Sequence, residues 1–255
     1  MKNKIVFITG ASSGIGEATA RRFAKEGADL LLCARRVEKL SALALELEAQ
    51  EKIKVYPFGL DVRDKEEVKD KLSQLPPAWL AIDILINNAG LAKGLEPLQK
   101  GDPSDWDEMI DTNIKGLLYI TRWVLPKMLA RNQGHIINIG SVAGHVVYPK
   151  GAVYCATKHA VLALTQGLRM DVFGTQIRVT TIDPGMVETD FSLIRFKGDQ
   201  SRAKAVYKGL TPLSPHDIAD TIHYCASRPP HVNIDEVILM PTAQAHATMV
   251  YRDEQ

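Results

Sequence analysis

Tyr154 and Lys158 are the two residues whose spacing most directly suggests chemistry. They stand four positions apart in a stretch of helical character, so their side chains fall one turn apart on one helix face. A free phenol has a pKa of about 10 and is a poor base at neutral pH. An ammonium one turn away favours the phenolate and lowers that pKa, which allows proton exchange with an alcohol or carbonyl. An ordinary surface pair is the alternative, and the residues upstream favour the chemical interpretation.

Ser141 ends an apolar segment that begins at Gly134 and is typical of a buried strand. The carboxyl end of a parallel strand is where α/β sheets place site residues. A loop containing glycine and proline follows, and it can bring the hydroxyl back toward Tyr154 at the start of a helix expected over residues 151–173. A hydroxyl, a tuned phenol and a cation suit proton transfer at an alcohol or carbonyl oxygen. Hydrolysis is disfavoured, because no base is placed to activate Ser141.

A glycine-rich loop follows the first apolar run, residues 5–8, and precedes a helix expected over 17–26. Strand, glycine loop and helix together indicate a dinucleotide site. The glycines permit a tight turn and close approach of the backbone to a pyrophosphate, and the helix N-terminus offers N–H groups to the phosphates. The spacing is G-x-x-x-G-x-G instead of the commoner G-x-G-x-x-G, and a turn without a ligand is the alternative. The loop residues expected to bind the cofactor are Gly10, Ser12, Ser13, Gly14, Ile15 and Gly16.

The end of the second expected strand, residues 28–34, determines which dinucleotide fits. An NAD site usually carries an acidic residue there, which bonds the ribose 2′-OH. In this chain Arg35 and Arg36 follow the strand, and the next acidic residue is Glu38. Two guanidiniums suit a 2′-phosphate, because an arginine grips it through two parallel hydrogen bonds. A solvated basic turn is the alternative, and we predict NADP(H) as the cofactor.

Strands and helices alternate along the whole chain without a linker or repeat. This alternation predicts one α/β domain over residues 1–255, a doubly wound parallel sheet of the Rossmann type with helices on both faces. The span 190–213 has weak periodicity and many charges, so we expect a flexible substrate loop over the site. The other expected elements are helices over 37–50, over 65–74, from Ser104 or Asp105 through Met128 and from Pro215, and strands over 54–59, 82–86, 176–183 and 237–240.

Composition excludes several classes of protein. The chain has 255 residues and a formal net charge of +1, so nothing suggests a nucleic acid or an anionic membrane as a partner. Cys33, Cys155 and Cys225 are far apart and odd in number, which argues for a reducing compartment. The seven histidines show no metal-ligand spacing, so no metal is expected. Without a signal peptide or a run long enough to span a membrane, the expected location is the cytoplasm.

These residues together resemble the short-chain dehydrogenase/reductase family over nearly the full length. Residues 9–16 are similar to its cofactor loop, and residues 87–90 to its sheet-stabilising motif. The resemblance implies that Tyr154 is the general acid/base and that Lys158 lowers its pKa and bonds the nicotinamide ribose. It also implies a homotetramer built on two long helices. Further implied roles are substrate-oxygen binding by Ser141, support of a relay water by Asn113, and cofactor contacts by Asp61, Val62, Asn88, Ala89, Gly90, Pro184, Gly185, Val187 and Thr189.

A narrower resemblance, to NADP-dependent 3-hydroxy acid dehydrogenases, rests on residues 82–98, 191–199 and 230–234. It implies a small hydroxy acid as substrate, whose carboxylate needs a cationic partner if water is excluded. Arg195 is the first choice, because a guanidinium matches a carboxylate fork and the residue follows an apolar run. A broad NADPH carbonyl reductase is one alternative. A non-catalytic NADPH-binding sensor or scaffold is another, disfavoured because sensing does not need Tyr154 and Lys158 together.

Overall fold

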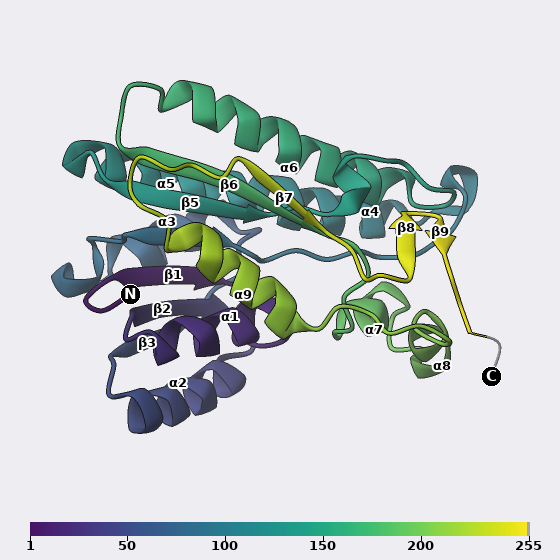
Figure 1. Cartoon of the computed structure of the whole chain (residues 1–255), viewed down its shortest axis with the longest axis horizontal. Coiled ribbons are helices and arrows are strands. Elements are labelled where there is room, and N and C mark those ends of the chain that lie inside the picture. The colour runs from purple at the N-terminus through teal and green to yellow at the C-terminus, as the bar shows by residue number, and fades with distance from the viewer. Residues whose placement is uncertain (254–255) are drawn as a thin grey trace.

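The computed structural model describes residues 1–253, and a seven-stranded sheet forms its centre (Figure 1). The strand order is β3-β2-β1-β4-β5-β6-β7, and every neighbouring pair is parallel. The chain runs outward from β1 in one direction and then returns to build the other half from β4. Such a reversal leaves a crevice at the carboxyl ends of the strands, where ligands bind. The strands are β1 (Ile5–Thr9), β2 (Asp29–Ala34), β3 (Val55–Gly59), β4 (Ile84–Asn87), β5 (Gly134–Ile139), β6 (Ile177–Pro184) and β7 (Glu236–Leu239).

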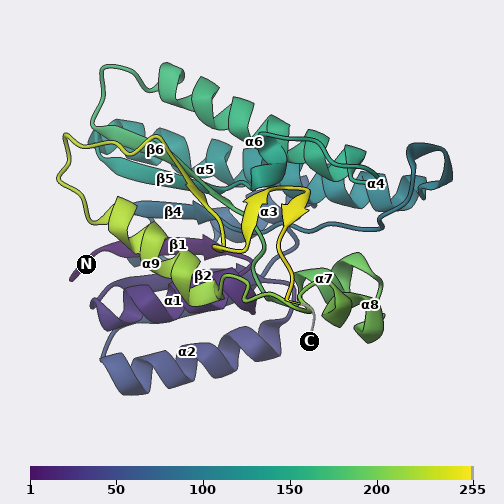
Figure 2. The ribbon, with the colours of Figure 1, turned by 45° about the vertical axis from the view of Figure 1, so that its right-hand side comes forward.

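Helices cover both faces of the sheet, because the central strands are apolar on both sides. In β1, Val6 and Ile8 belong to one core and Phe7 to the other, and all three are fully buried. Helices α1 (Gly14–Lys25), α2 (Val37–Glu51) and α9 (Pro215–Ala226) complete the first core. Helices α3 (Lys65–Ser73), α5 (Leu117–Arg131) and α6 (Ala152–Asp171) cover the other face, as Figures 1 and 2 show. The predicted single doubly wound α/β domain is confirmed.

The long helix predicted to start at Ser104 or Asp105 is wrong in two respects. It begins at Pro103, because the side chain of Asp102 caps it by accepting the Ser104 N–H at 3.0 Å. It is also not one regular helix. Wider π-type turns, η3 (Asp111–Gly116), separate α4 (Pro103–Ile110) from α5. Such insertions occur often at functional sites, and this one carries Asn113.

The segment 190–213, which is expected to be a flexible loop over the site, contains regular secondary structure. It forms two short helices, α7 (Phe191–Arg195) and α8 (Gln200–Ala205), beyond the carboxyl ends of the strands (Figures 1 and 2). Between them the backbone turns at Lys197 and Gly198, which have φ angles of 52° and 94°. Asp199 then caps α8 by accepting the Arg202 N–H at 3.0 Å. Each helix is too short for a hydrophobic period to reveal it. We call residues 190–213 the lid.

The last predicted strand, 237–240, corresponds to β7, but it is not the last element. An antiparallel hairpin of β8 (Gln244–His246) and β9 (Met249–Val250) follows and lies beside the lid. Arg252 after the hairpin donates to the Val206 carbonyl at 2.9 Å. Within residues 1–253 no helix is long and apolar enough to cross a membrane. The short helices η1 (Pro77–Trp79), η2 (Leu98–Lys100) and η4 (Val142–Gly144) complete the secondary structure.

Candidate active site

A cavity of about 760 Å³ opens at the carboxyl ends of the central strands, under the lid. Its size is that of a site for a small ligand or cofactor. Two predicted site residues, Gly16 and Asn113, are not among those that line it. The predicted residues that do line it are Gly10, Ser12, Ser13, Gly14, Ile15, Arg35, Arg36, Asp61, Val62, Asn88, Ala89, Gly90, Ser141, Tyr154, Lys158, Pro184, Gly185, Val187, Thr189 and Arg195.

Ser141, Tyr154 and Lys158 meet at this cavity. Ser141 follows β5 and starts η4, where its hydroxyl oxygen accepts the Ala143 N–H at 3.1 Å. Tyr154 and Lys158 lie in the first two turns of α6, with the Lys158 Nζ 6.0 Å from the centre of the phenol ring. The same Nζ donates to the Ile139 carbonyl oxygen at 2.8 Å. The three side chains therefore line one cavity.

The net shift of the phenol pKa is opposite to the lowering that the Tyr154–Lys158 spacing predicted. Burial raises the pKa of Tyr154 well above its usual value, although Arg195 and hydrogen bonding with Ser141 act in the opposite direction. Burial also lowers the pKa of Lys158 to about 8, and the charge of Asp183 partly opposes this. Desolvation therefore outweighs the attraction between neighbours, because both side chains are at most 9% exposed. Sequence spacing contains no information about that burial.

The Asn113 side chain links two segments that border the site. Its Oδ1 accepts the Leu91 N–H at 2.9 Å, and its Nδ2 donates to the Leu91 carbonyl at 2.9 Å and to the Thr157 hydroxyl at 3.0 Å. Thr157 in turn donates to the Tyr154 carbonyl at 2.7 Å. The π-type turns of η3 therefore join the segment after β4 to the turn of α6 that carries Tyr154.

The glycine loop has the shape of a cradle for phosphates. Gly10 has a φ of +66°, and a Cβ there would lie 3.0 Å from the Ala89 backbone. A Cβ on Gly16 would lie 2.4 Å from the Gly10 carbonyl oxygen, so this glycine serves close packing of helix and loop. Only glycine fits these positions without shifting the backbone. The residues present therefore fit a dinucleotide whose pyrophosphate approaches the start of α1.

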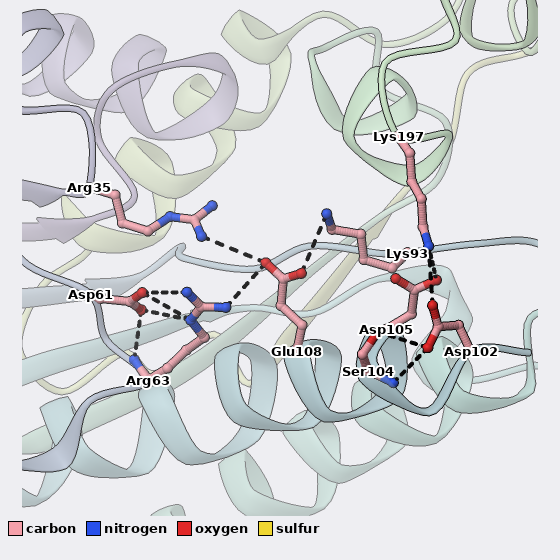
Figure 3. Close-up of polar contacts among 9 residues, drawn as sticks. All are labelled: Arg35, Asp61, Arg63, Lys93, Asp102, Ser104, Asp105, Glu108 and Lys197. Atoms are coloured by element: carbon pink, nitrogen blue, oxygen red, sulfur yellow. Dashed lines mark hydrogen bonds and ion pairs between the residues drawn. The ribbon is translucent and has the colours of Figure 1, made fainter.

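The two arginines after β2 lie at one end of the cavity with exposed guanidiniums. Arg36 donates to the hydroxyls of Ser12 and Ser13 at 3.2 and 2.5 Å, which ties it to the glycine loop. Arg35 lies 3.6 Å from Glu108, as Figure 3 shows. Their side chains are 53% and 43% exposed, so both can reach an anion. No acidic side chain occupies the end of β2, where an NAD site would need one.

Glu108 joins the cofactor end of the site to the segment after β4. Besides Arg35, it contacts Arg63 at 3.3 Å and Lys93 at 3.4 Å (Figure 3). Arg63 also binds Asp61 through two guanidinium nitrogens. Asp61 is thus held at the edge of the cavity by a cation on the following turn. Sequence reasoning missed Glu108 and Arg63, since they stand outside any recognised motif.

The lid places Arg195 beside the phenol. Its guanidinium carbon lies 5.0 Å from the centre of the Tyr154 ring and 5.1 Å from that of Phe191. Its Nη2 donates to the Tyr148 hydroxyl at 2.8 Å, while its Nε is buried and has no hydrogen-bond partner among residues 1–253. Arg195 lines the cavity, and a half-buried guanidinium there suits an anionic group of a ligand. Tyr148 and Phe191 also line the cavity, and sequence reasoning missed both.

Hydrogen bonds and ion pairs hold the lid against the rest of the domain. The Gly94 N–H donates to the Arg195 carbonyl at 2.9 Å, which fixes α7 to the segment after β4. Lys197 lies 2.9 Å from Asp105 and 3.6 Å from Asp102 at the start of α4 (Figure 3). On the opposite side, the Tyr207 hydroxyl donates to the Val187 carbonyl at 2.8 Å. The lid is therefore closed over the cavity.

The β8–β9 hairpin supports the opposite wall. Gln244 is buried, and its side-chain oxygen accepts the Met186 N–H at 2.8 Å. A Cβ on Gly185 would lie 2.3 Å from that oxygen, so Pro184 and Gly185 are held between the hairpin and the cavity. Gln244 was missed because the sequence after β7 shows no strand pattern.

Within residues 1–253, three side chains of types that often bind metals lie close together although they are far apart in sequence. The ligand atoms of His145, Asp183 and Glu236 lie within 4.8 Å of one another. Two hydrogen-bond donors already occupy Asp183 Oδ1, and Oδ2 lies 3.2 Å from the His145 imidazole. We interpret the group as a carboxylate–imidazole contact with a second carboxylate nearby.

Comparison with known proteins agrees with this geometry. The profile of the short chain dehydrogenase family matches residues 4–198. NADP-dependent 3-hydroxy acid dehydrogenase YdfG of Salmonella typhi is 48% identical over 95% of this chain and 97% of its own length. Sulfoacetaldehyde reductase 2 of Chromohalobacter salexigens is 48% identical, over 94% and 95%. The closed form of serine dehydrogenase complexed with NADP+ has a TM-score of 0.91 at 45% identity, over 98% of this chain and all of that one. The chain therefore belongs to the short-chain dehydrogenase family.

Proposed function

We propose that this protein is an NADP-dependent oxidoreductase that transfers a hydride between the nicotinamide and the hydroxyl-bearing carbon of small 3-hydroxy acids. The observation that carries the substrate class is Arg195, which lines the cavity with its guanidinium carbon 5.0 Å from the centre of the Tyr154 ring. Arg195 and Tyr154 line the same cavity, so a small acid could contact both residues. Relatives named for 3-hydroxy acids and for serine support the same substrate class.

NADP is the cofactor that the residues around the glycine loop fit. Arg35 and Arg36 offer exposed guanidiniums at the end of β2, where an acid would select NAD. Ser12 and Ser13 orient Arg36, and Gly10 and Gly16 keep the backbone open to a pyrophosphate. When bound, the nicotinamide supplies or accepts the hydride.

Tyr154 is the residue that exchanges a proton with the substrate. Its raised pKa keeps the phenol protonated at neutral pH, which suits donation to a carbonyl oxygen during reduction. For oxidation the phenolate must form, and the cations of Lys158 and Arg195 then stabilise it. Ser141 offers its hydroxyl to the substrate oxygen at which negative charge develops. Lys158, with a pKa of about 8, carries its charge at neutral pH.

Arg195 suits the carboxylate better than the other lid cations do. Lys197 is engaged by Asp105 at 2.9 Å, and Arg202 packs its guanidinium over Phe196 at 4.3 Å. Lys204 and Lys208 are exposed. Tyr148 holds the Arg195 guanidinium in place from the side of the Ser141 loop.

A second candidate is reduction of small aldehydes or ketones of broader type. Three aromatic rings, those of Tyr148, Tyr154 and Phe191, surround the Arg195 guanidinium within 5.9 Å and offer apolar surface to a neutral substrate. The sulfoacetaldehyde reductase relative suggests that another short anion, a sulfonate, fits the same cation. A non-catalytic NADPH sensor is the weakest candidate, because Ser141, Tyr154 and Lys158 all meet at the cavity.

We also propose a cytoplasmic homotetramer. Free, buried cysteines at positions 33, 155 and 225 support a reducing compartment. Leu118 and Leu129 on α5 and Met170 on α6 are exposed apolar residues, and Phe173 just after α6 is 92% exposed. These are the two long helices on which the family resemblance placed the interface. A native mass measurement tests this assembly.

The test of function is a turnover screen of small hydroxy acids and neutral alcohols, each with NADP and with NAD. We expect the fastest turnover with NADP and a 3-hydroxy acid or its 3-oxo counterpart. Faster turnover of neutral alcohols supports the broad reductase, and NADPH binding without turnover of any compound supports the sensor.

A further inference from the structure

Asp183 is a buried carboxylate next to Ser141 that does not line the cavity. It lies near the end of β6, its residue is 1% exposed, and its Oδ1 accepts two hydrogen bonds. One comes from the Ser141 backbone N–H and the other from the Thr181 hydroxyl, both at 3.0 Å. The last backbone hydrogen bond between β5 and β6 runs from the Gly140 N–H to the Ile182 carbonyl at 2.8 Å. At the next residue, Ser141, the Asp183 carboxylate accepts the backbone N–H in place of a carbonyl.

Gly140 makes this approach possible. A Cβ on Gly140 would lie 1.7 Å from Asp183 Oδ1, and no side chain can occupy that space while the carboxylate is there. The close fit distinguishes the contact from an incidental one, because both the glycine and the acid are needed for it.

The other carboxylate oxygen reaches the far end of the same turn. Ser141 starts η4, and His145 ends it. The His145 Nε2 lies 3.2 Å from Asp183 Oδ2 and 3.7 Å from Glu236 on β7. A single side chain from β6 thus accepts a hydrogen bond at one end of the turn that presents the Ser141 hydroxyl and contacts the imidazole at the other end.

We propose that Asp183 is a positioning residue for the reaction, which holds the Ser141 turn at both ends and places a fixed negative charge behind the site. The proposal rests on the proposed function, because it takes from it the roles of Ser141, Tyr154 and Lys158. Asp183 touches neither substrate nor cofactor and acts only through these residues.

The charge of Asp183 also acts on Lys158. Burial lowers the pKa of Lys158 to about 8, and the charge of Asp183 is what raises it in the opposite direction. The ionisable groups that face Asp183 are His145, Glu236 and Lys158. Burial raises the pKa of Asp183 itself, Glu236 adds to this, and His145 opposes it. Both the acid limb and the alkaline limb of the pH–rate profile should therefore respond to the charge of Asp183.

Asp183→Asn tests the proposal, because it keeps the shape and one acceptor oxygen and removes the charge. For carbonyl reduction we expect kcat to fall roughly ten-fold, the loss of one charge-assisted contact, and the KM for NADPH to stay unchanged. Reduction needs both Lys158 and Tyr154 protonated, and the raised pKa of Tyr154 leaves Lys158 to titrate first. Without the Asp183 charge, the alkaline limb of kcat/KM should therefore move to lower pH.

Two further variants separate positioning from mere structure. Glu236→Gln also removes one negative charge from the cluster of His145, Asp183 and Glu236, but it leaves the hydrogen bond from the Ser141 N–H to Asp183 in place. This variant should therefore keep the kcat and the alkaline limb of the wild type. His145→Gln removes the contact that lowers the pKa of Asp183. Its acid limb should move to higher pH, because the carboxylate then becomes protonated sooner as the pH falls. An unshifted pH profile in both Asp183→Asn and His145→Gln would overturn the proposal, and so would equal losses in Asp183→Asn and Glu236→Gln.

Amide hydrogen exchange provides a test that needs no turnover. The Ser141 N–H should exchange at least roughly ten-fold faster in Asp183→Asn than in the wild type, while amides of β1 exchange equally in both. Unchanged exchange at Ser141 contradicts the proposal even if the enzyme assay has failed. A failed assay in the wild type, by contrast, counts only against the proposed function.

Discussion

The guanidinium of Arg195 lies over the ring of Tyr154, with 5.0 Å between its Cζ and the ring centre. One residue comes from the lid and the other from the first turn of α6, so a closed lid is what brings them together. A cation beside the phenol favours its ionised form and offers a partner to an anionic substrate group at the same time. Under the proposed function, this one contact would couple substrate recognition to proton transfer.

Replacement of Arg195 should therefore affect charged substrates selectively. Arg195→Ala removes a charge-assisted contact worth about 1.5 kcal/mol, so the KM for hydroxy acids should rise roughly ten-fold or more. Neutral alcohols should be affected much less. Arg195→Lys keeps the charge but loses the planar guanidinium that matches a carboxylate and the hydrogen bond to Tyr148, so we expect only partial recovery. Steady-state kinetics on matched acid and alcohol substrates measures both effects, and an equal rise for both substrates contradicts the assignment.

The cofactor preference should depend on the arginines after β2. Arg35→Ala and Arg36→Ala should each raise the KM for NADP roughly ten-fold and leave that for NAD little changed. Lys39→Ala, an exposed charge on α2 outside the cavity, is the matched control. If the wild type turns over faster with NAD at low concentrations of both cofactors, the NADP assignment fails.

Tyr154→Phe keeps the ring and removes the oxygen that exchanges the proton. Nearly all turnover should disappear, while the affinity for NADPH measured by fluorescence titration stays close to that of the wild type. Lys158→Ala should impair both turnover and cofactor affinity, because the family resemblance gives this residue both roles. Near-normal rates in Tyr154→Phe would exclude it as the acid/base.

The pH dependence of carbonyl reduction should report Lys158. Its pKa is lowered to about 8, whereas that of Tyr154 is raised, so Lys158 loses its proton first as pH rises. The kcat/KM for reduction should therefore decline above about pH 8, which a profile across the alkaline range will show. A rate that stays constant well beyond that pH would mean that the Lys158 charge is not needed.

The ion pair of Lys197 with Asp105 should help to keep the lid closed. It joins an exposed lysine to a carboxylate whose side chain is only 12% exposed, at 2.9 Å. Lys197→Ala should raise the substrate KM by about two- to five-fold, in line with the energy of an ion pair close to the surface. Lys204→Ala, an exposed lysine on α8, should change nothing. Equal effects of the two substitutions would show that only the net charge of the lid matters.

Sequence patterns predicted the parts of this fold that depend on local chemistry. The apolar run of residues 5–8 corresponds to β1, and the glycine loop adopts the positive φ angles that its glycines allow. The spacing of Tyr154 and Lys158 correctly indicated one face of α6. Each of these features involves residues that are close along the chain, where helix and strand periods apply.

Features that depend on distant residues could not be predicted in this way. The pKa shifts of Tyr154 and Lys158 follow from burial among segments that are far apart in sequence. The lid helices are too short to show a period, and the hairpin that carries Gln244 has none. Asp183 stands beside a recognised Pro-Gly pair, yet its contact with Ser141 spans two strands.

The most direct test of the central claim compares kcat/KM, with NADP, for 3-hydroxybutyrate and for a neutral secondary alcohol of similar size. The account predicts that the wild type prefers the acid by roughly ten-fold or more and that Arg195→Ala loses most of this preference. A wild type that prefers the neutral alcohol would contradict the account and favour a broad carbonyl reductase.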